Sequence, residues 1–252
     1  MRSPTVKSAT PGPTDNGLDL TNAKFALPGD ARALPPAVAA VIAALEADII
    51  QGRILPRSRL IEDHLMEDYG AKRHAVRAAL DELQRLGVVT KPRHRGAELR
   101  RFDAGEIARL YDLRETLHRM AVRCMRRPDT EIDPAEIETL DHWLRVHVEA
   151  ARQGDVVAVH RSNMMFHDAL FSLSGNPFLA ASIRQHDWIS FPIRAYGVTD
   201  TDALAQASRE HREMVDALRD GRFDELERLV VAHISRARDI YERRFFVERS
   251  LR

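Results

Sequence analysis

Histidines gather in the C-terminal part of this chain, where eight of its 11 histidines lie beyond residue 102. Neutral imidazole is a common ligand of divalent metals near neutral pH, and it suits both zinc and nickel. Asn163 and His167 are four residues apart, so a helix would place them on one face. His211 and His233 lie on two other predicted helices, so three histidines from three helices could converge in a bundle core and bind a metal. Spacing alone does not show that three segments meet, and histidines scattered over surface and core are the alternative.

A second group of candidate functional side chains is basic and lies between residues 71 and 101. This stretch has nine Lys and Arg against three Asp and Glu, whereas the whole chain has no net charge. A local basic patch on a neutral protein is typical of a module that binds duplex DNA, although an ordinary charged surface gives the same count. The candidate DNA-binding residues are Lys72, Arg73, His74, Arg77, Arg93, His94, Arg95 and Gly96.

The elements that must position these basic residues form a predicted winged helix-turn-helix. Apolar residues at three- and four-residue spacing predict a helix over about 38–50, and residues 54–55 suggest a short extended piece. A second helix begins near residue 60, with an apolar face made of Leu60, Ile61, Leu65 and Met66. Gly70 permits a sharp turn into a third helix, which ends at Gly87. Strands at 88–89 and 97–99 would then form the wing, so that a basic helix tip lies beside a basic hairpin.

This stretch resembles a known DNA-binding domain over residues 38–99. It contains a spaced Gly52, Pro56 and Leu60, then Arg73, Val76, Arg77, Ala79 and Leu80, then Leu83 and Gly87, and finally Arg93 and Gly96 in the wing. Together these positions resemble the DNA-binding domain of the GntR family of bacterial repressors. The resemblance implies that Arg73 and Arg77 contact DNA and that the wing reaches phosphates or the minor groove. The alternative is that these arginines form surface ion pairs with Asp68, Asp81 or Glu82.

The sequence departs from the usual GntR pattern at three places in this domain. Arg57 stands where the family usually has a glycine, directly after the proline. Lys72 and His74 replace a serine and a threonine whose hydroxyls could meet phosphates. These changes predict an unusual operator preference.

The rest of the chain is predicted to be helical. Pro128, Gly154, Gly175 and Gly221 mark breaks between successive helices. The predicted helices span 103–127, 133–153, 155–174, 176–196, 201–220 and 222–248. Short connections favour an antiparallel all-helical bundle. The predicted fold class is therefore mainly α, with a winged helix-turn-helix followed by this bundle.

The bundle resembles the FCD ligand-binding domain of FadR-type GntR regulators, in its six-helix VanR-like form. The matching segments are Asn163 to Leu179, Glu210 to Gly221, and His233. The resemblance implies a divalent metal, zinc or nickel first, on Asn163, His167, His211 and His233. Asn163 is neutral where many relatives have aspartate. The resemblance also implies that Arg114 binds a small carboxylate effector, with His118 one turn away and Arg161 and Arg194 as weaker candidates. An ion pair of Arg114 with Asp112 or Glu115 is the alternative.

These inferences divide the chain into three parts. Residues 1–33 are predicted to be a disordered arm, residues 34–100 the DNA-binding domain, and residues 102–252 the effector-binding and dimerisation domain. Phe245, Phe246 and Val247 are an apolar candidate for the dimer contact, with packing on their own bundle as the alternative. One cysteine, no long apolar run and no secretory signal predict a cytoplasmic protein without a membrane partner.

The expected function is that of a homodimeric transcriptional regulator, a repressor of its operator DNA, controlled by a small organic acid. Two alternatives belong to other classes. A metal-dependent enzyme tethered to DNA would need a general base beside the histidines, and Glu210 is expected to point about 100° around its helix from His211. A non-sensing, dimeric architectural DNA-binding protein would need neither metal nor effector.

Overall fold

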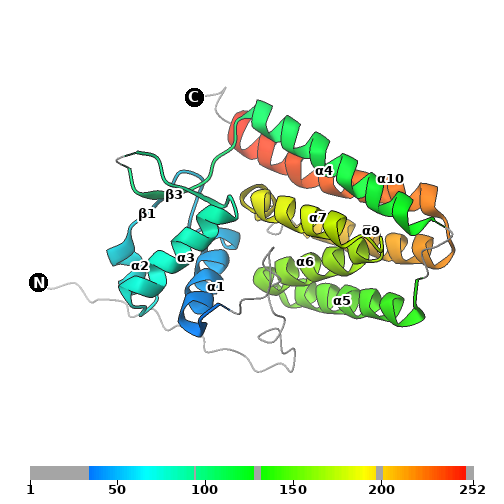
Figure 1. The fold of residues 1–252 in the computed structure, drawn as a ribbon, viewed down its shortest axis with the longest axis horizontal. Helices are drawn as coiled ribbons and strands as arrows, with labels where there is room; N and C mark the ends of the chain where they lie inside the picture. The colour runs from blue at the N-terminus through cyan, green and yellow to red at the C-terminus, as the bar shows by residue number, and fades with distance from the viewer. Residues whose placement is uncertain (1–33, 94, 128–131, 197–200, 248–252) are drawn as a thin grey trace, which may run out of the picture.

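The computed structural model describes residues 34–93, 95–127, 132–196 and 201–247. The predicted N-terminal arm and His94 lie outside these residues. The fold class is mainly α, as predicted, with a small sheet near the N-terminus (Figure 1). No helix in the described ranges is long and apolar enough to cross a membrane.

The N-terminal unit is a winged helix-turn-helix. Its elements are α1 (Pro36–Ile50), β1 (Arg59–Leu60), α2 (Glu62–Asp68), α3 (Arg73–Arg85), β2 (Val89–Thr90) and β3 (Ala97–Leu99). The sheet order is β1-β3-β2, and both pairs are antiparallel, with Arg59 opposite Glu98 and Val89 opposite Leu99. Leu45 of α1 and Val76 and Leu80 of α3 are buried between the helices.

Two details of this unit differ from the prediction. The extended piece lies at Arg59–Leu60 rather than at 54–55, and Leu60 therefore belongs to a strand and not to the second helix. Ile61, expected on the apolar face, is 44% exposed. Leu99 accounts for the shift, because its N–H donates to the Ser58 carbonyl and its carbonyl accepts from the Arg57 N–H. These bonds attach the segment before α2 to β3.

Arg57 is the one non-glycine residue of the described chain with a positive φ, at 70°. This is the position where the sequence departs from the usual glycine. A residue with a Cβ in the left-handed region destabilises the folded state by about 1–2 kcal/mol. A glycine avoids this strain, but its greater entropy in the unfolded state offsets part of the gain. We expect Arg57→Gly to raise the free energy of unfolding by about 1 kcal/mol in urea titrations. Arg57→Ala keeps a Cβ and should give no such gain; equal gains in both variants would contradict the strain argument.

The C-terminal unit is a helical bundle. Its elements are α4 (Ala104–Met125), α5 (Pro134–Gln153), α6 (Val156–Ser172), α7 (Pro177–Ile189), α8 (Phe191–Arg194), α9 (Thr201–Arg219), α10 (Phe223–Glu242) and the π-helical turn η2 (Arg243–Val247). Helix α4 lies beside α10, α5 lies beside α6, and α7 and α9 run between these pairs (Figure 1). Asp103 and Asp133 cap α4 and α5 with complete capping boxes.

The fourth and sixth predicted helices are each interrupted. The fourth breaks at Ser190 into α7 and α8, since Pro192 has no N–H to donate to the preceding turn. The sixth passes into η2 after Glu242. Phe245 and Phe246 pack with Tyr241 of the same chain, which is the alternative that the sequence had left open for this tail.

One apolar core joins the two units. Trp188 and Phe191 of the bundle pack in the same buried cluster as Leu45 of α1. Within this interface, Glu46 Oε2 accepts hydrogen bonds from Arg161 Nη2 at 2.9 Å and Arg161 Nε at 3.2 Å. Arg161 was a candidate effector ligand, but its guanidinium is directed at α1 of the DNA-binding unit. The prediction for Arg161 is not supported by its position.

Glu46 makes the stability of this interface depend on pH. Burial raises its pKa to about 7, although Arg161 opposes the shift. A carboxyl group with a raised pKa stabilises the fold when protonated, and this contribution is lost as the pH rises through the folded-state value. Relative to Glu46→Gln, the wild type should therefore lose roughly 2 kcal/mol of unfolding free energy between pH 5.5 and pH 8. Urea unfolding at both pH values measures this difference, and a constant difference would refute the assignment.

Candidate metal and effector pocket and candidate DNA-binding surface

Three histidines from three helices meet in the bundle. Nε2 of His167 on α6 lies 3.1 Å from Nε2 of His233 on α10 and 3.3 Å from Nε2 of His211 on α9. One potential ligand atom from each lies within 4.8 Å of the others. Imidazoles around a tetrahedral zinc, with zinc–nitrogen bonds of 2.0–2.1 Å, place their nitrogens about 3.3 Å apart. The donor set therefore fits a small divalent metal, and Asn163 lines the same cavity.

The environment of the cluster keeps two of its imidazoles neutral, those of His167 and His211. Burial, together with the neighbouring histidines, lowers the pKa of His167 and of His211 well below the ordinary value. A neutral imidazole offers a lone pair, whereas an imidazolium does not. His167 and His211 are therefore in the protonation state that metal binding requires.

The cluster opens on a cavity of about 90 Å³. Its polar wall consists of Arg114, His118, His147, His160, Asn163, His167, Asp187, Arg194, His233 and Arg236. Its apolar wall comes mainly from α9 and α10 and includes Leu204, Ala207, Ile234 and Ile240. Of the three predicted effector-binding residues, Arg114 and His118 line this cavity and Arg161 does not.

Arg114 is a buried cation that already has one anionic partner. Its Nη2 donates to Asp187 Oδ1 of α7 at 2.7 Å, and not to Asp112 or Glu115, the partners that the sequence suggested. Burial raises the pKa of Asp187, but Arg114 and Arg194 outweigh it and hold that pKa below its usual range. Arg114 Nε and Nη1 are buried without a hydrogen-bond partner in the described structure. Two donors of this guanidinium are therefore available to a ligand.

His118 adds two more unused polar atoms. Both of its ring nitrogens are buried and make no hydrogen bond to the described residues. Burial, and then Arg114, lower its pKa to about 3, so the ring is neutral near pH 7. Buried polar atoms without partners are costly in a protein interior unless a ligand or water completes them. The cavity thus presents polar atoms from Arg114 and His118 in addition to the histidine cluster.

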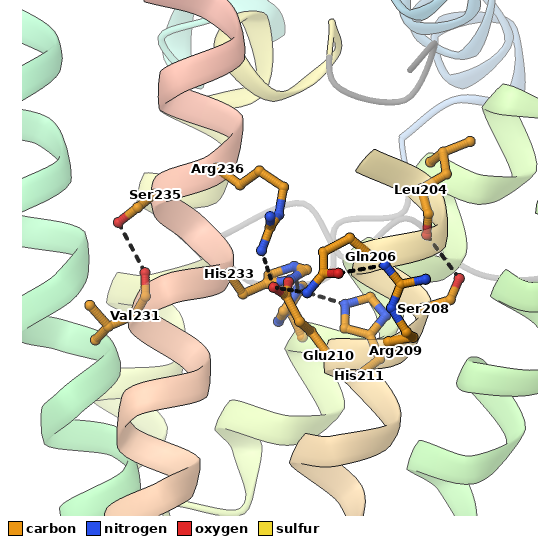
Figure 2. Close-up of polar contacts among 11 residues, drawn as sticks. Leu204, Gln206, Ser208, Arg209, Glu210, His211, Val231, His233, Ser235 and Arg236 are labelled. Carbon is orange, nitrogen blue, oxygen red and sulfur yellow. Dashed lines mark hydrogen bonds and ion pairs between the residues drawn. The ribbon is translucent and has the colours of Figure 1, made fainter. Parts of the chain in front are cut away.

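Sequence reasoning missed two carboxylates of this site. Asp187 is 73 residues from Arg114, and no spacing pattern connects them. Glu210 was expected to point about 100° around its helix from His211, and its contact with His233 was not predicted: Glu210 Oε2 accepts from His233 Nδ1 at 2.8 Å (Figure 2). The expectation considered only the helix that carries His211. Glu210 does turn away from His211, but α10 packs on that side and brings His233 to it.

The basic surface lies on α3 and the wing. Lys72, Arg73, His74 and Arg77 are exposed at the start of α3, and Arg93, Arg95 and Gly96 are exposed in the wing turn. Gly96 has a φ of 73°, a conformation that glycine adopts without strain. These residues form one solvent-accessible set on the elements that a winged helix presents to a duplex.

The α3 arginines make ion pairs with α2. Arg77 Nε donates to Glu62 Oε2 at 2.8 Å, and Arg73 Nη2 donates to Asp63 Oδ1 at 2.6 Å. The sequence had suggested Asp68, Asp81 or Glu82 as partners, but Asp81 pairs with Lys91 instead. Exposed pairs of this kind contribute little to stability. They hold the guanidinium groups near the α2–α3 turn, and because the pairs are weak, the same groups can exchange the carboxylates for DNA.

The comparisons with known proteins match both units. Residues 37–99 match the family model of bacterial regulatory proteins of the gntR family, and residues 109–236 match the FCD domain. The HTH-type transcriptional regulator YdhC of Bacillus subtilis is 24% identical over 193 residues, which cover 76% of this chain and 84% of YdhC.

Two solved structures share the fold. E. coli McbR/YncC has a TM-score of 0.69 at 19% identity, covering 84% of this chain and all of that one. A Rhodococcus sp. RHA1 structure assigned to the GntR regulators has a TM-score of 0.61 at 24% identity, covering 81% of this chain and 96% of that one. At these identities the structural matches establish the fold alone.

Proposed function

Because this chain belongs to the GntR family of DNA-binding transcriptional regulators and carries an FCD domain, we propose that it is a repressor controlled by a small organic acid. The family and the relatives are regulators and not enzymes, which removes the tethered metal enzyme from consideration. The proposed division of the chain places the operator-binding unit in residues 34–100 and the effector-binding unit in residues 102–252.

The observation that carries the proposal is one cavity lined by Arg114, by Asn163 and by two members of the histidine cluster, His167 and His233. Asn163, His167, His211 and His233 would hold zinc or nickel. The bound metal would supply a positive centre for one carboxylate oxygen of the effector. Arg114 would donate Nε–H or Nη1–H to the same acid, and His118 would provide a further donor or acceptor. The small cavity favours an acid of a few carbon atoms.

Helix α6 is the proposed route from this cavity to the DNA-binding unit. It carries His167 inside the pocket and Arg161 at the interface, where Arg161 binds Glu46 of α1. Helices α1 and α6 are in contact, and α1 packs on α3, which carries the candidate DNA-binding residues. A ligand changes operator affinity only if it prefers one of two arrangements of these helices.

The operator-binding form is proposed to be a homodimer. One winged helix of this size contacts one half-site of duplex DNA, and a two-fold axis doubles the interface. The bundle is the proposed source of the dimer contact, since α3 and the wing are needed for DNA.

The test begins with an operator selected from random duplexes by the zinc-loaded protein. Operator affinity is then measured with and without a panel of small mono-, di- and hydroxycarboxylates, in the wild type and in Arg114→Met. One or more acids should weaken binding by about 5–150-fold, which is the usual range of allosteric coupling. The effect should be absent in Arg114→Met. Binding of DNA that no acid or metal alters would instead favour the non-sensing architectural protein.

A further inference from the structure

The ligand set of the candidate metal site is electrically neutral. His167, His211 and His233 are imidazoles, and Asn163 is an amide. A cation bound by these groups alone would find no negative charge among its ligands. A carboxylate that contacts one of these ligands would therefore matter more here than at a site with an acidic ligand.

Glu210 is such a carboxylate. It lies on α9 directly before His211, is 4% exposed, and contacts His233 of α10 (Figure 2). Its Oε2 accepts from His233 Nδ1 at 2.8 Å. Its Oε1 accepts from Gln206 Nε2 at 3.0 Å and from Arg236. Donors from α9 and α10 thus fix the carboxylate on both of its oxygens.

The hydrogen bond to Glu210 decides which nitrogen of His233 is free. A carboxylate accepts and does not donate, so the proton of a neutral His233 must be on Nδ1. Nε2 is then unprotonated, and it is the atom that faces His167 Nε2 at 3.1 Å. The other two imidazoles lack this control, because Nδ1 of His167 and Nδ1 of His211 are buried without a partner in the described structure.

We propose that Glu210 is the positioning residue of the metal site: it holds His233 as the Nδ1–H tautomer and places a carboxylate, which it shares with Arg236, directly against one metal ligand. This inference rests on the proposed function, since it requires that the histidine cluster binds a metal. Glu210 does not itself contact the metal in this proposal and acts through His233. Carboxylates that orient ligand histidines in this way raise metal affinity by about 10–100-fold.

The test compares Glu210→Gln with Glu213→Gln. Glu213 is an exposed residue on the same helix, so its substitution makes the same change of charge away from the site. Zinc affinity, measured by competition with a chelating dye, should fall by about 10–100-fold in Glu210→Gln and stay within about twofold of the wild type in Glu213→Gln. Equal affinities of Glu210→Gln and the wild type would overturn the proposal. Circular dichroism establishes that both variants are folded.

A second readout needs no metal. Ring ¹⁵N NMR of the metal-free wild type should show His233 as the Nδ1–H tautomer, and Glu210→Ala should show a mixture of tautomers. A wild type with the proton on Nε2 would overturn the positioning role. A wild type that binds no zinc but keeps His233 as the Nδ1–H tautomer would refute the metal-sensing function while leaving the Glu210–His233 arrangement established. The two failures are therefore distinguishable.

Discussion

Replacing His211 with alanine should reduce zinc in the purified protein from one ion per chain to a trace after dialysis against a weak chelator. His211 is fully buried and its Nε2 lies 3.3 Å from His167 Nε2. A four-ligand zinc site is worth about 10–16 kcal/mol, so one ligand accounts for roughly 3 kcal/mol. That loss corresponds to on the order of a hundredfold or more in affinity. Elemental analysis of protein purified without a metal-affinity tag measures it.

Two further variants make this result specific. His167→Ala removes a different member of the cluster and should have the same effect, whereas His142→Ala removes an exposed histidine of α5 and should retain the metal. Circular dichroism separates loss of a ligand from loss of the fold. Retention of stoichiometric zinc in both cluster variants would contradict the assignment of the site.

The candidate metal ligands could be predicted from the sequence because helical spacing and a family motif can both be recognised within short stretches of the chain. The sequence indicates His167, His211 and His233, and the structure brings one potential ligand atom of each within 4.8 Å of the others. Their convergence depends on the packing of α6, α9 and α10, which local periodicity does not encode. The same limit explains why Asp187 and Glu210 were missed, since each acts on a residue of another helix.

The type and order of most helices were predicted correctly, but some helix boundaries were not. The six predicted helices correspond to α4, α5, α6, α7, α9 and α10, but the separate short helix α8 was not predicted. The break before it at Ser190 leaves no mark in the periodicity, because Phe191 and Ile193 continue the apolar pattern across Pro192. Arg161 was assigned to the effector for a related reason. Its charge and its place beside Asn163 are visible in the sequence, but the buried Glu46 that pairs with it is 115 residues away.

Arg77→Ala should weaken binding to the selected operator by about 1–3 kcal/mol, which is roughly 5–150-fold. The side chain of Arg77 is 60% exposed in the N-terminal half of α3, and its planar guanidinium donors match either guanine O6 and N7 or a phosphate. To bind DNA, Arg77 has to release its exposed ion pair with Glu62, and such a pair contributes little to stability. Gel-shift titration at fixed salt measures the change.

The stability of the domain should be nearly unaffected by Arg77→Ala, because the pair that is lost is solvent-exposed and α3 keeps its buried face of Val76 and Leu80. Arg152→Ala is the matched control, since Arg152 forms a similar exposed pair with Glu149 on α5 of the bundle. It should leave operator affinity unchanged.

The dependence of affinity on salt then identifies the DNA partner of Arg77. A phosphate contact predicts that the slope against log salt falls by about one and that all sequences lose affinity alike. A base contact predicts an unchanged slope and relaxed preference at one position of the half-site. Full operator affinity in Arg77→Ala would exclude both the phosphate contact and the base contact of Arg77. Recognition of the operator sequence would then have to come from Lys72, Arg73 or the wing.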